Sequence, residues 1–192
     1  MVRFSDGSAM RLYRQTIEDF SLYPGQELSD DRMVDLRTAA GAMSAKMRAV
    51  RIVAATNVSK SDLEQRLIHK GEDPEQARKA VKWMADLDLV DDRKTAEQIV
   101  SRCISRGYGV SRAKQALYEK RIPKQYWDEV LRDYPDQTGH IVAFLRTRLG
   151  DDWTDNELRK AIDALMRRGH NYRQIRAALE QLDLETDEFP ED

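Results

Sequence analysis

A leucine recurs in this chain at intervals of about fifty residues, each time near the end of a short amphipathic helix. Leu67, Leu117 and Leu165 are 50 and 48 residues apart, and a basic residue follows three positions after each of them. A period of this length is typical of arrays whose short helical units bury their apolar faces partly against their neighbours. The repeat therefore constrains the chain to a fold built from similar helical units.

Each of these helices has a predicted helix before it and another after it, which gives three triplets. The leading helices are expected at 42–56, about 92–106 and about 137–149. The apolar positions of the following helices are Ala77, Val81 and Met84, then Tyr126, Val130 and Leu131, and finally Tyr172, Ile175 and Leu179. Because these positions recur at helical spacing, the sequence predicts a mostly all-α fold.

Capping residues mark where several of these helices begin and end. Ser59 with Asp62 and Thr154 with Glu157 have the spacing of a capping box, and Asp73 precedes a proline at a first helical position. Three glycines stand where left-handed turns close helices, namely Gly71, Gly107 and Gly169. A long helical pattern from Ser29 to about Thr56 contains Gly41, which we expect to mark a bend or break.

The first thirty residues have a different pattern. Val2 and Phe4 alternate with polar residues before Asp6-Gly7, and Met10 and Leu12 alternate after it. An Asp-Gly between two alternating runs predicts a β-hairpin, since glycine tolerates the positive φ of the tight turn. A short helix is expected after it, around Ile17 and Phe20, ending near Tyr23.

These patterns predict an elongated array of three tandem three-helix modules with a short N-terminal β-hairpin extension. The expected segments are the hairpin extension at 1–28, a first helical module with its lead-in helix at 29–90, a second module at 91–134, a third at 135–182, and an acidic disordered tail at 183–192.

The charges are unevenly distributed although the formal net charge is only −2. Residues 93–132 contain ten Lys or Arg against four Asp or Glu, whereas residues 183–192 contain six acids and no base. A local basic excess of this kind is typical of a segment that meets a polyanion or an acidic protein surface. The competing interpretation is a solvated helix face, but Glu119 is the only acid among the central cations, so neutralisation within the segment is limited.

Residues that could carry chemistry have structural interpretations instead. Cys103 is in register with an apolar helix stripe, which predicts a core position, and a single cysteine allows no internal disulfide. The spacing of the three histidines, His69, His140 and His170, is not that of zinc ligands. Asp91-Asp92 is expected to begin a helix rather than bind a metal. Gly107-Tyr108-Gly109 lacks the Lys-Ser/Thr of a phosphate-binding loop, and its two glycines are expected to let one helix end and the next begin at a sharp angle. We therefore predict no catalytic residues, metal or cofactor, and no enzyme activity.

No apolar run has the length of a signal peptide or of a membrane span. The sequence therefore predicts a cytoplasmic protein that has no membrane partner.

Two central stretches and one C-terminal stretch carry a family resemblance. The first is Leu89-Val90-Asp91-Asp92, followed by Ala96-Glu97 and Arg102. The second runs from Arg106 through Gly107-Tyr108-Gly109 to Arg112, followed by Leu117 and Lys120, and the third is 165–170. In this order and spacing they resemble the RecX family of regulatory proteins over nearly the whole chain. The N-terminal hairpin resembles an extension of the longer members.

Four positions depart from the family pattern. Thr95 and Ile99 stand where the family often has aromatic residues, Arg121 stands where a glycine follows Lys120, and His170 stands where an aromatic usually follows Arg-Gly. The first two affect local packing, and Arg121 affects the C-cap of its helix. None of them removes a group that a known mechanism needs.

The resemblance implies a protein that lies in the groove of the RecA–single-stranded DNA filament and restrains RecA ATPase and strand exchange in DNA repair and recombination. Some members also bind single- or double-stranded DNA directly, and a monomer is expected. The residues expected to contact RecA or DNA are Arg102, Arg106, Arg112, Lys114, Lys120, Arg121, Arg167 and Arg168. The last two belong to a basic set interleaved with acids, so pairing within their own module is the alternative. The alternative functions are a DNA-binding helical-repeat protein that acts on recombination indirectly and a generic helical adaptor.

Overall fold

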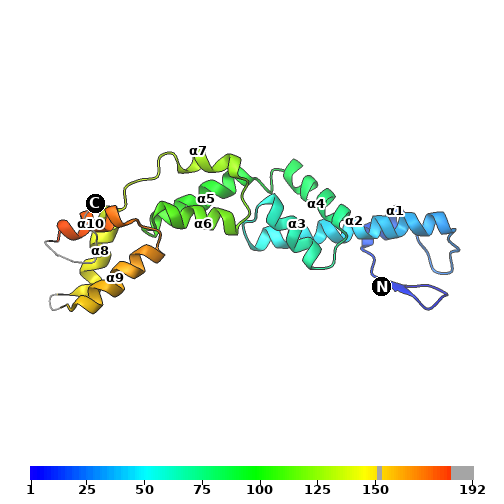
Figure 1. Ribbon diagram of the computed structural model, residues 1–192. Helices are drawn as coiled ribbons and strands as arrows, with labels where there is room; N and C mark the ends of the chain where they lie inside the picture. The colour runs from blue at the N-terminus through cyan, green and yellow to red at the C-terminus, as the bar shows by residue number, and fades with distance from the viewer. Residues whose placement is uncertain (151–152, 183–192) are drawn as a thin grey trace. The chain divides into compact units, whose positions relative to one another are not determined.

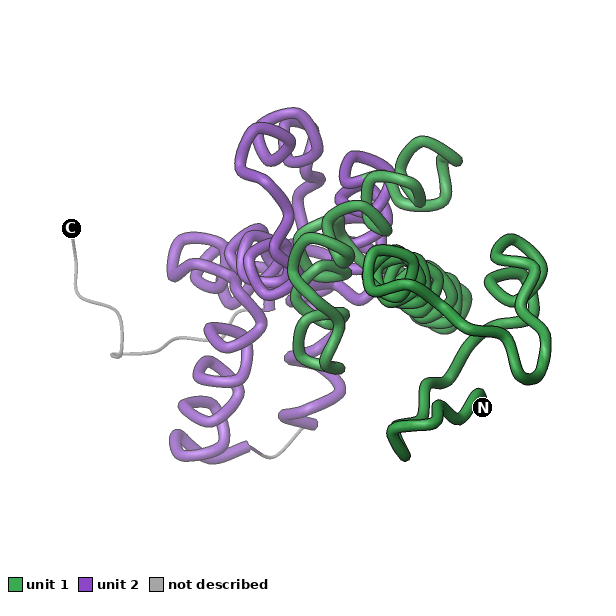
Figure 2. The backbone as a smooth tube through the Cα atoms, turned by 90° about the vertical axis from the view of Figure 1, so that its right-hand side faces the viewer, with its two compact units in different colours: residues 1–91 green, residues 92–192 purple. Residues whose placement is uncertain are grey.

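The computed structural model describes residues 1–150 and 153–182, and the predicted acidic tail lies outside this part of the chain. The chain divides into two compact units, residues 1–91 and residues 92–192 (Figure 2). The described residues form a two-stranded sheet and helices α1 to α10, with one additional 3₁₀ turn (Figure 1). The fold is mostly all-α with an N-terminal hairpin, as the sequence predicted, while the exact arrangement of three modules stays a prediction.

The hairpin at the start of unit 1 confirms the signal of Asp6-Gly7. Strand β1 (Val2–Arg3) pairs antiparallel with β2 (Ala9–Met10). Gly7 closes the turn at a φ of +83°, and the Asp6 carboxylate accepts a hydrogen bond from the Ser8 N–H at 2.8 Å. The short helix α1 (Arg14–Asp19) follows. Apolar side chains of the hairpin, among them Val2, Phe4 and Met10, pack against buried Leu36.

Helix α2 (Asp30–Ala55) continues without interruption through Gly41, so the predicted break is wrong. A glycine in a helix costs only about 1 kcal/mol relative to alanine. Alanines flank Gly41 on both sides, and a Cβ at Gly41 would lie 3.8 Å from Cγ of Gln76, which stands on helix α4 (Pro74–Asp86). Packing against a neighbouring helix thus outweighs the local helix-breaking tendency of the glycine.

Helix α3 (Lys60–His69) and helix α4 complete unit 1. The Ser59 hydroxyl accepts from the Asp62 N–H, which is one half of the predicted capping box. Asp73 accepts from the N–H groups of the first turn of α4, as the capping pattern predicted. Helices α2, α3 and α4 pack around one apolar core. Its buried residues include Ala45, Ala49, Leu63, Leu67, Ala77, Val81 and Met84.

The first half of unit 2 contains α5 (Asp92–Ser105) and α6 (Val110–Glu119), and then a 3₁₀ turn (Lys124–Tyr126) leads into the five-residue helix α7 (Trp127–Leu131). Asp92 begins α5, in agreement with the expectation for the two aspartates. Cys103 is buried next to this core, also as expected, and the core itself is formed by Ala96, Val100, Leu117 and Ile122. The Trp127 indole N–H donates to the Ile122 carbonyl at 3.0 Å, which fixes the short helix on the end of α6.

The second half of unit 2 is the bundle of α8 (Thr138–Leu149), α9 (Asp155–Arg167) and α10 (Tyr172–Glu180) (Figure 1). Its core is the largest apolar cluster of unit 2 and includes Ile141, Leu145, Leu158, Ile162, Leu165, Ile175 and Leu179. The capping box of Thr154 and Glu157 is confirmed. A second box, Asn171 with Gln174, begins α10 and was not predicted.

The repeated leucine marks the same turn in all three places. The N–H three residues past each helix end returns to the leucine carbonyl, from Glu72 to Leu67, from Ile122 to Leu117 and from His170 to Leu165, at 3.0 to 3.2 Å. The preceding residue is left-handed each time, with φ of +88°, +54° and +87° at Gly71, Arg121 and Gly169. Arg121 therefore adopts the glycine geometry even though an L side chain there costs free energy.

Candidate binding surface and the joint that supports it

Two glycine-containing turns from opposite halves of unit 2 meet through their backbones. The Gly109 N–H donates to the Arg168 carbonyl at 3.0 Å, across 59 positions of sequence. A Cβ on Gly109 would lie 2.0 Å from the Gly169 carbonyl oxygen, and one on Gly169 would lie 2.3 Å from the Arg112 nitrogen. Such distances leave no room for any side chain. We call the contact of Gly107, Gly109, Gly169 and His170 the glycine joint.

Gly107 and His170 complete the joint. Gly107 ends α5 at a φ of +63°, and a Cβ on it would lie 2.8 Å from the Cβ of His140, which stands on α8. The His170 ring is 3% exposed, and its Nε2 lies 3.0 Å from the Gly107 carbonyl oxygen. The sequence interpretation of Gly107 and Gly109 as a sharp link between two helices was incomplete, because these glycines also admit the α9–α10 turn.

Tyr134 ties the chain that leaves α7 back to the same link. Its hydroxyl donates to the Tyr108 carbonyl at 2.6 Å. Burial is the main cause, and the neighbouring Cys103 the second cause, of a rise in the pKa of Tyr134 to about 12. The folded state thus favours the neutral phenol, since only that form can donate this hydrogen bond.

We expect Tyr134→Phe to lower the free energy of unfolding by about 1 to 2 kcal/mol, because the half-buried Tyr108 carbonyl loses its donor. The unfolded phenol ionises near pH 10, so this stabilising effect is present below pH 10 and is lost as pH rises towards 12. Urea unfolding at pH 8 and pH 11 measures the difference between the two proteins. A difference that does not shrink at pH 11 would contradict the assignment.

Three of the predicted cations act on the buried Cys103 thiol in the last turn of α5. Burial raises the pKa of the Cys103 thiol, and the guanidinium groups of Arg112, Arg106 and Arg102 oppose that rise. All three arginines therefore lie near one thiol, although Arg112 comes from α6. Arg102 and Arg106 are exposed, and as i, i+4 neighbours they share one side of the chain at the end of α5.

The glycine joint places the end of α9 beside the first turn of α6. The Arg168 guanidinium lies over the Phe144 ring, 4.4 Å from its centroid, and the adjacent Gly169 contacts Arg112. Arg167 is exposed at the same helix end. We call the set of Arg102, Arg106, Arg112, Arg167 and Arg168 the basic surface.

The remaining predicted cations are not part of this set. Lys120 and Arg121 stand at the opposite end of α6 from Arg112, and each has an interaction of its own. Arg112 is itself paired with Glu119 at 3.1 Å. Among the described residues, the predicted cations whose side chains have no ionic, hydrogen-bonding or aromatic partner are Arg102, Arg106, Lys114 and Arg167. Exposed cations with no partner are the ones available to a binding partner.

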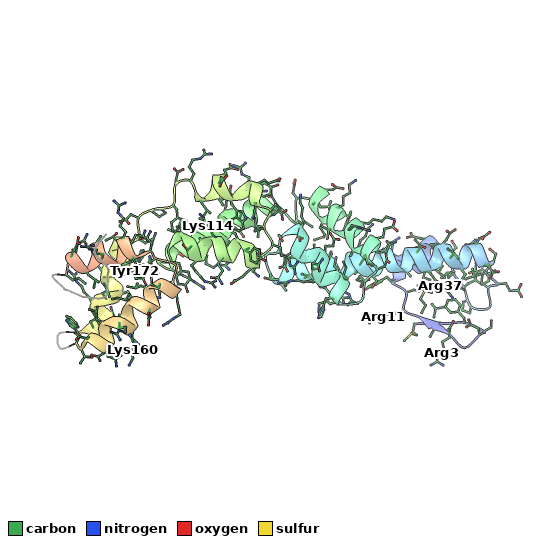
Figure 3. The ribbon with its side chains drawn as sticks, viewed as in Figure 1. Arg3, Arg11, Arg37, Lys114, Lys160 and Tyr172 are labelled. Carbon is green, nitrogen blue, oxygen red and sulfur yellow. The ribbon has the colours of Figure 1, made fainter. Side chains whose placement is uncertain are left out.

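Sequence reasoning missed the exposed aromatic residues near these cations. Tyr118 is 72% exposed and stands four residues after Lys114, so both lie on one side of α6, and Tyr172 at the start of α10 is 56% exposed. Figure 3 shows Lys114, Tyr172 and also Lys160, which precedes Arg167 by two helical turns on α9. The i, i+4 spacing of Lys114 and Tyr118 is the signal that could have found the first pair.

Unit 1 has exposed arginines that the sequence reasoning did not select, among them Arg3, Arg11 and Arg37 (Figure 3). The pKa of Asp6 at the hairpin turn is lowered mainly by hydrogen bonds from Ser8. The positive charge of Arg37 lowers the pKa of Asp6 further. Acidic residues are as frequent as basic ones around these positions, so this region has no basic excess comparable to that of residues 93–132.

Within 1–150 and 153–182, no group of three or more His, Cys, Asp or Glu residues could hold a metal ion. No helix in that part of the chain is both long enough and apolar enough to cross a membrane. The fold and the site thus define a protein of short consecutive helices whose distinctive chemistry lies on exposed cationic surfaces.

Comparisons with known proteins agree with this class. The chain is 30% identical over 156 residues to the regulatory protein RecX of Halorhodospira halophila, which covers 79% of this chain and 97% of that protein. It is 27% identical to the regulatory protein RecX of Lactococcus lactis over 96% of this chain and 72% of that protein. A scan against protein-family models gives no match.

Solved structures show the same fold. A crystal structure of a regulatory protein RecX superposes with a TM-score of 0.66 at 18% identity, covering 94% of this chain and 90% of that one. The crystal structure of RecX from Lactobacillus salivarius gives 0.64 at 22% identity, covering 76% and 98%. The chain belongs to the RecX family of regulatory proteins.

Proposed function

We propose that this protein binds the RecA–single-stranded DNA filament in the cytoplasm, as a monomer, and mostly inhibits the ATPase and recombinase activities of RecA. The family supports a regulatory role of this kind. The observation that carries the proposal is the glycine joint, because it holds the turn of Arg168 and Gly169 against the first turn of α6 at Arg112, which lies near the Cys103 thiol together with Arg102 and Arg106. Regulation by occupation of a filament needs such a surface and no catalytic group.

The exposed members of the basic surface are suited to steer encounter with an acidic partner. Arg102, Arg106 and Arg167 are exposed and unpaired within the described part of the chain. Exposed charges of this type increase the association rate and make it dependent on salt. A guanidinium also binds carboxylates and phosphates with two parallel hydrogen bonds, so acidic RecA side chains and DNA phosphates are both suitable partners.

Direct binding of single-stranded DNA is a second candidate function, and the pair of Lys114 and Tyr118 favours it. An exposed aromatic ring next to a cation can stack on a base while the cation contacts a phosphate. This function predicts affinity for DNA without RecA, with a steep loss on raising the salt concentration.

The decisive experiment is a titration of RecA, single-stranded DNA and ATP with this protein while ATP hydrolysis is followed. We expect a saturable fall in hydrolysis. An unchanged rate at saturating protein would reject the proposal. Anisotropy of labelled single-stranded DNA, measured without RecA, tests the second function separately. The salt concentration is varied between about 50 and 200 mM, because binding through phosphate contacts loses about 10³–10⁵ in affinity over this range.

A further inference from the structure

The surroundings of the His170 ring provide enough hydrogen-bond acceptors for its neutral form only. A carbonyl oxygen can only accept, so the Nε2 of His170 carries the proton and donates to Gly107. The Nδ1 of the neutral ring then has a lone pair, and it is buried without a hydrogen-bond partner among the described residues. Protonation of Nδ1 would create a buried N–H with no acceptor, next to the backbone contact of Gly109 and Arg168.

The charged groups around His170 make a second positive charge unfavourable. Burial lowers the pKa of His170 most; the Gly107 carbonyl opposes this, while Arg168 at the end of α9 and His140 on α8 lower the pKa further. Arg112 opens α6 on the other side of the Gly169 turn. No carboxylate of the described residues is among the groups that act on the ring.

We propose that His170 is a positioning residue that keeps the glycine joint closed only while its imidazole is neutral, so that acidification releases the α9–α10 turn from α6 and divides the basic surface. The effect on partner binding rests on the proposed function, whereas the release of the joint does not.

The direction of the effect is opposite to that of an ordinary cationic surface. Binding to an acidic partner usually strengthens as pH falls, since histidines gain positive charge. Here the pKa of His170 is lowered in the folded state, so the stabilising effect on the joint is complete above pH 6.5 and is lost as pH falls below it. One linked proton changes the opening equilibrium by up to about tenfold per pH unit.

The joint itself is tested by hydrogen exchange of the Gly109 amide in the full chain, without a partner. The pH is varied from about 7.5 to about 5.5, because the ordinary histidine pKa of about 6.5 lies within this range. Protection is expressed relative to the intrinsic rate at each pH. We expect it to fall by up to about tenfold per pH unit below 6.5 in the native protein. Constant protection of the native Gly109 amide would overturn the proposal without any variant.

Four variants assign the effect to one residue. His170→Gln keeps an N–H donor and His170→Phe keeps an aromatic ring, and neither titrates, so both should show a flat profile of protection. His140→Gln removes the neighbouring imidazole, and His69→Gln removes an exposed histidine of unit 1. Both should retain the native fall. A flat profile in His140→Gln, or a native profile in His170→Gln, would assign the switch to another group and overturn the proposal.

Binding to the RecA–single-stranded DNA filament is then measured over the same pH range. The native protein should lose affinity at pH 5.5 relative to a His170→Phe protein, by no more than the fold-change seen in exchange, because affinity falls only with the closed fraction of the joint. Equal pH dependence of binding in the two proteins would overturn the positioning role. Absence of binding at every pH would reject the proposed function, and the exchange experiment would still decide whether the joint is controlled by His170.

Discussion

Replacement of Gly109 by alanine is expected to destabilise unit 2 by about 3 kcal/mol, at the upper end of the usual cost of overpacking. The new Cβ would lie 2.0 Å from the Gly169 carbonyl oxygen, 2.3 Å from the Gly169 carbonyl carbon and 2.6 Å from the His170 nitrogen. All three atoms belong to the backbone, so no side-chain rotation relieves the clash. The two turns must separate, and the hydrogen bond from Gly109 to Arg168 is lost with them.

Urea unfolding followed by tryptophan fluorescence measures this effect. A Trp83→Phe background confines the signal to Trp127 and Trp153, which both belong to unit 2. The matched control is Gly139→Ala, since Gly139 stands in α8 and a Cβ added there would meet no neighbouring atom within 4 Å. Alanine is the better helix former, so the control should gain about 0.5 to 1 kcal/mol. A Gly109→Ala protein within about 1 kcal/mol of the native one would show that the joint is not tightly packed.

Local sequence signals predicted the ends of elements well, because each depends on residues only a few positions apart. Asp6-Gly7 predicted the hairpin turn, Thr154 with Glu157 predicted a capping box, and Gly71 and Gly169 predicted left-handed turns. Arg121 shows that the turn geometry is set by the helix end rather than by the glycine, since a nonglycine residue adopts it at the same place in the repeat.

Features that depend on distant residues were not predictable in this way. Gly41 has a local breaking tendency that packing against Gln76 overrides. The glycine joint unites Gly109 with Gly169, and no pattern within either turn indicates the other. The i, i+4 rule correctly grouped Arg102 with Arg106, but the proximity of Arg112 to the α9–α10 turn follows from the joint alone. Grouping all eight predicted cations by charge also placed Lys120 and Arg121 with the others, whereas they lie at the far end of α6.

Under the proposed function, reversal of two charges on the basic surface, Arg102→Glu with Arg106→Glu, is expected to raise the concentration needed to inhibit RecA by about 10- to 100-fold, equivalent to about 1.4 to 2.8 kcal/mol. Both side chains are exposed and unpaired within the described residues, so the reversal changes the surface that is offered to a partner and breaks no ion pair of the fold. The free energy of unfolding should change by no more than about 1 kcal/mol, because surface substitutions and the loss of a cation at a helix end both have small effects on stability.

The matched control is Arg78→Glu with Lys82→Glu on α4, which makes the same change in net charge at two exposed i, i+4 positions of unit 1. If inhibition depends on the basic surface, this control should shift the titration by less than about threefold, a free-energy change under about 0.7 kcal/mol. A higher salt concentration should weaken inhibition by the native protein more than inhibition by the Arg102→Glu, Arg106→Glu protein. The native basic surface has more exposed positive charge for salt to screen. Equal shifts in the two reversed proteins would mean that net charge, and not the surface beside the glycine joint, determines the proposed inhibition.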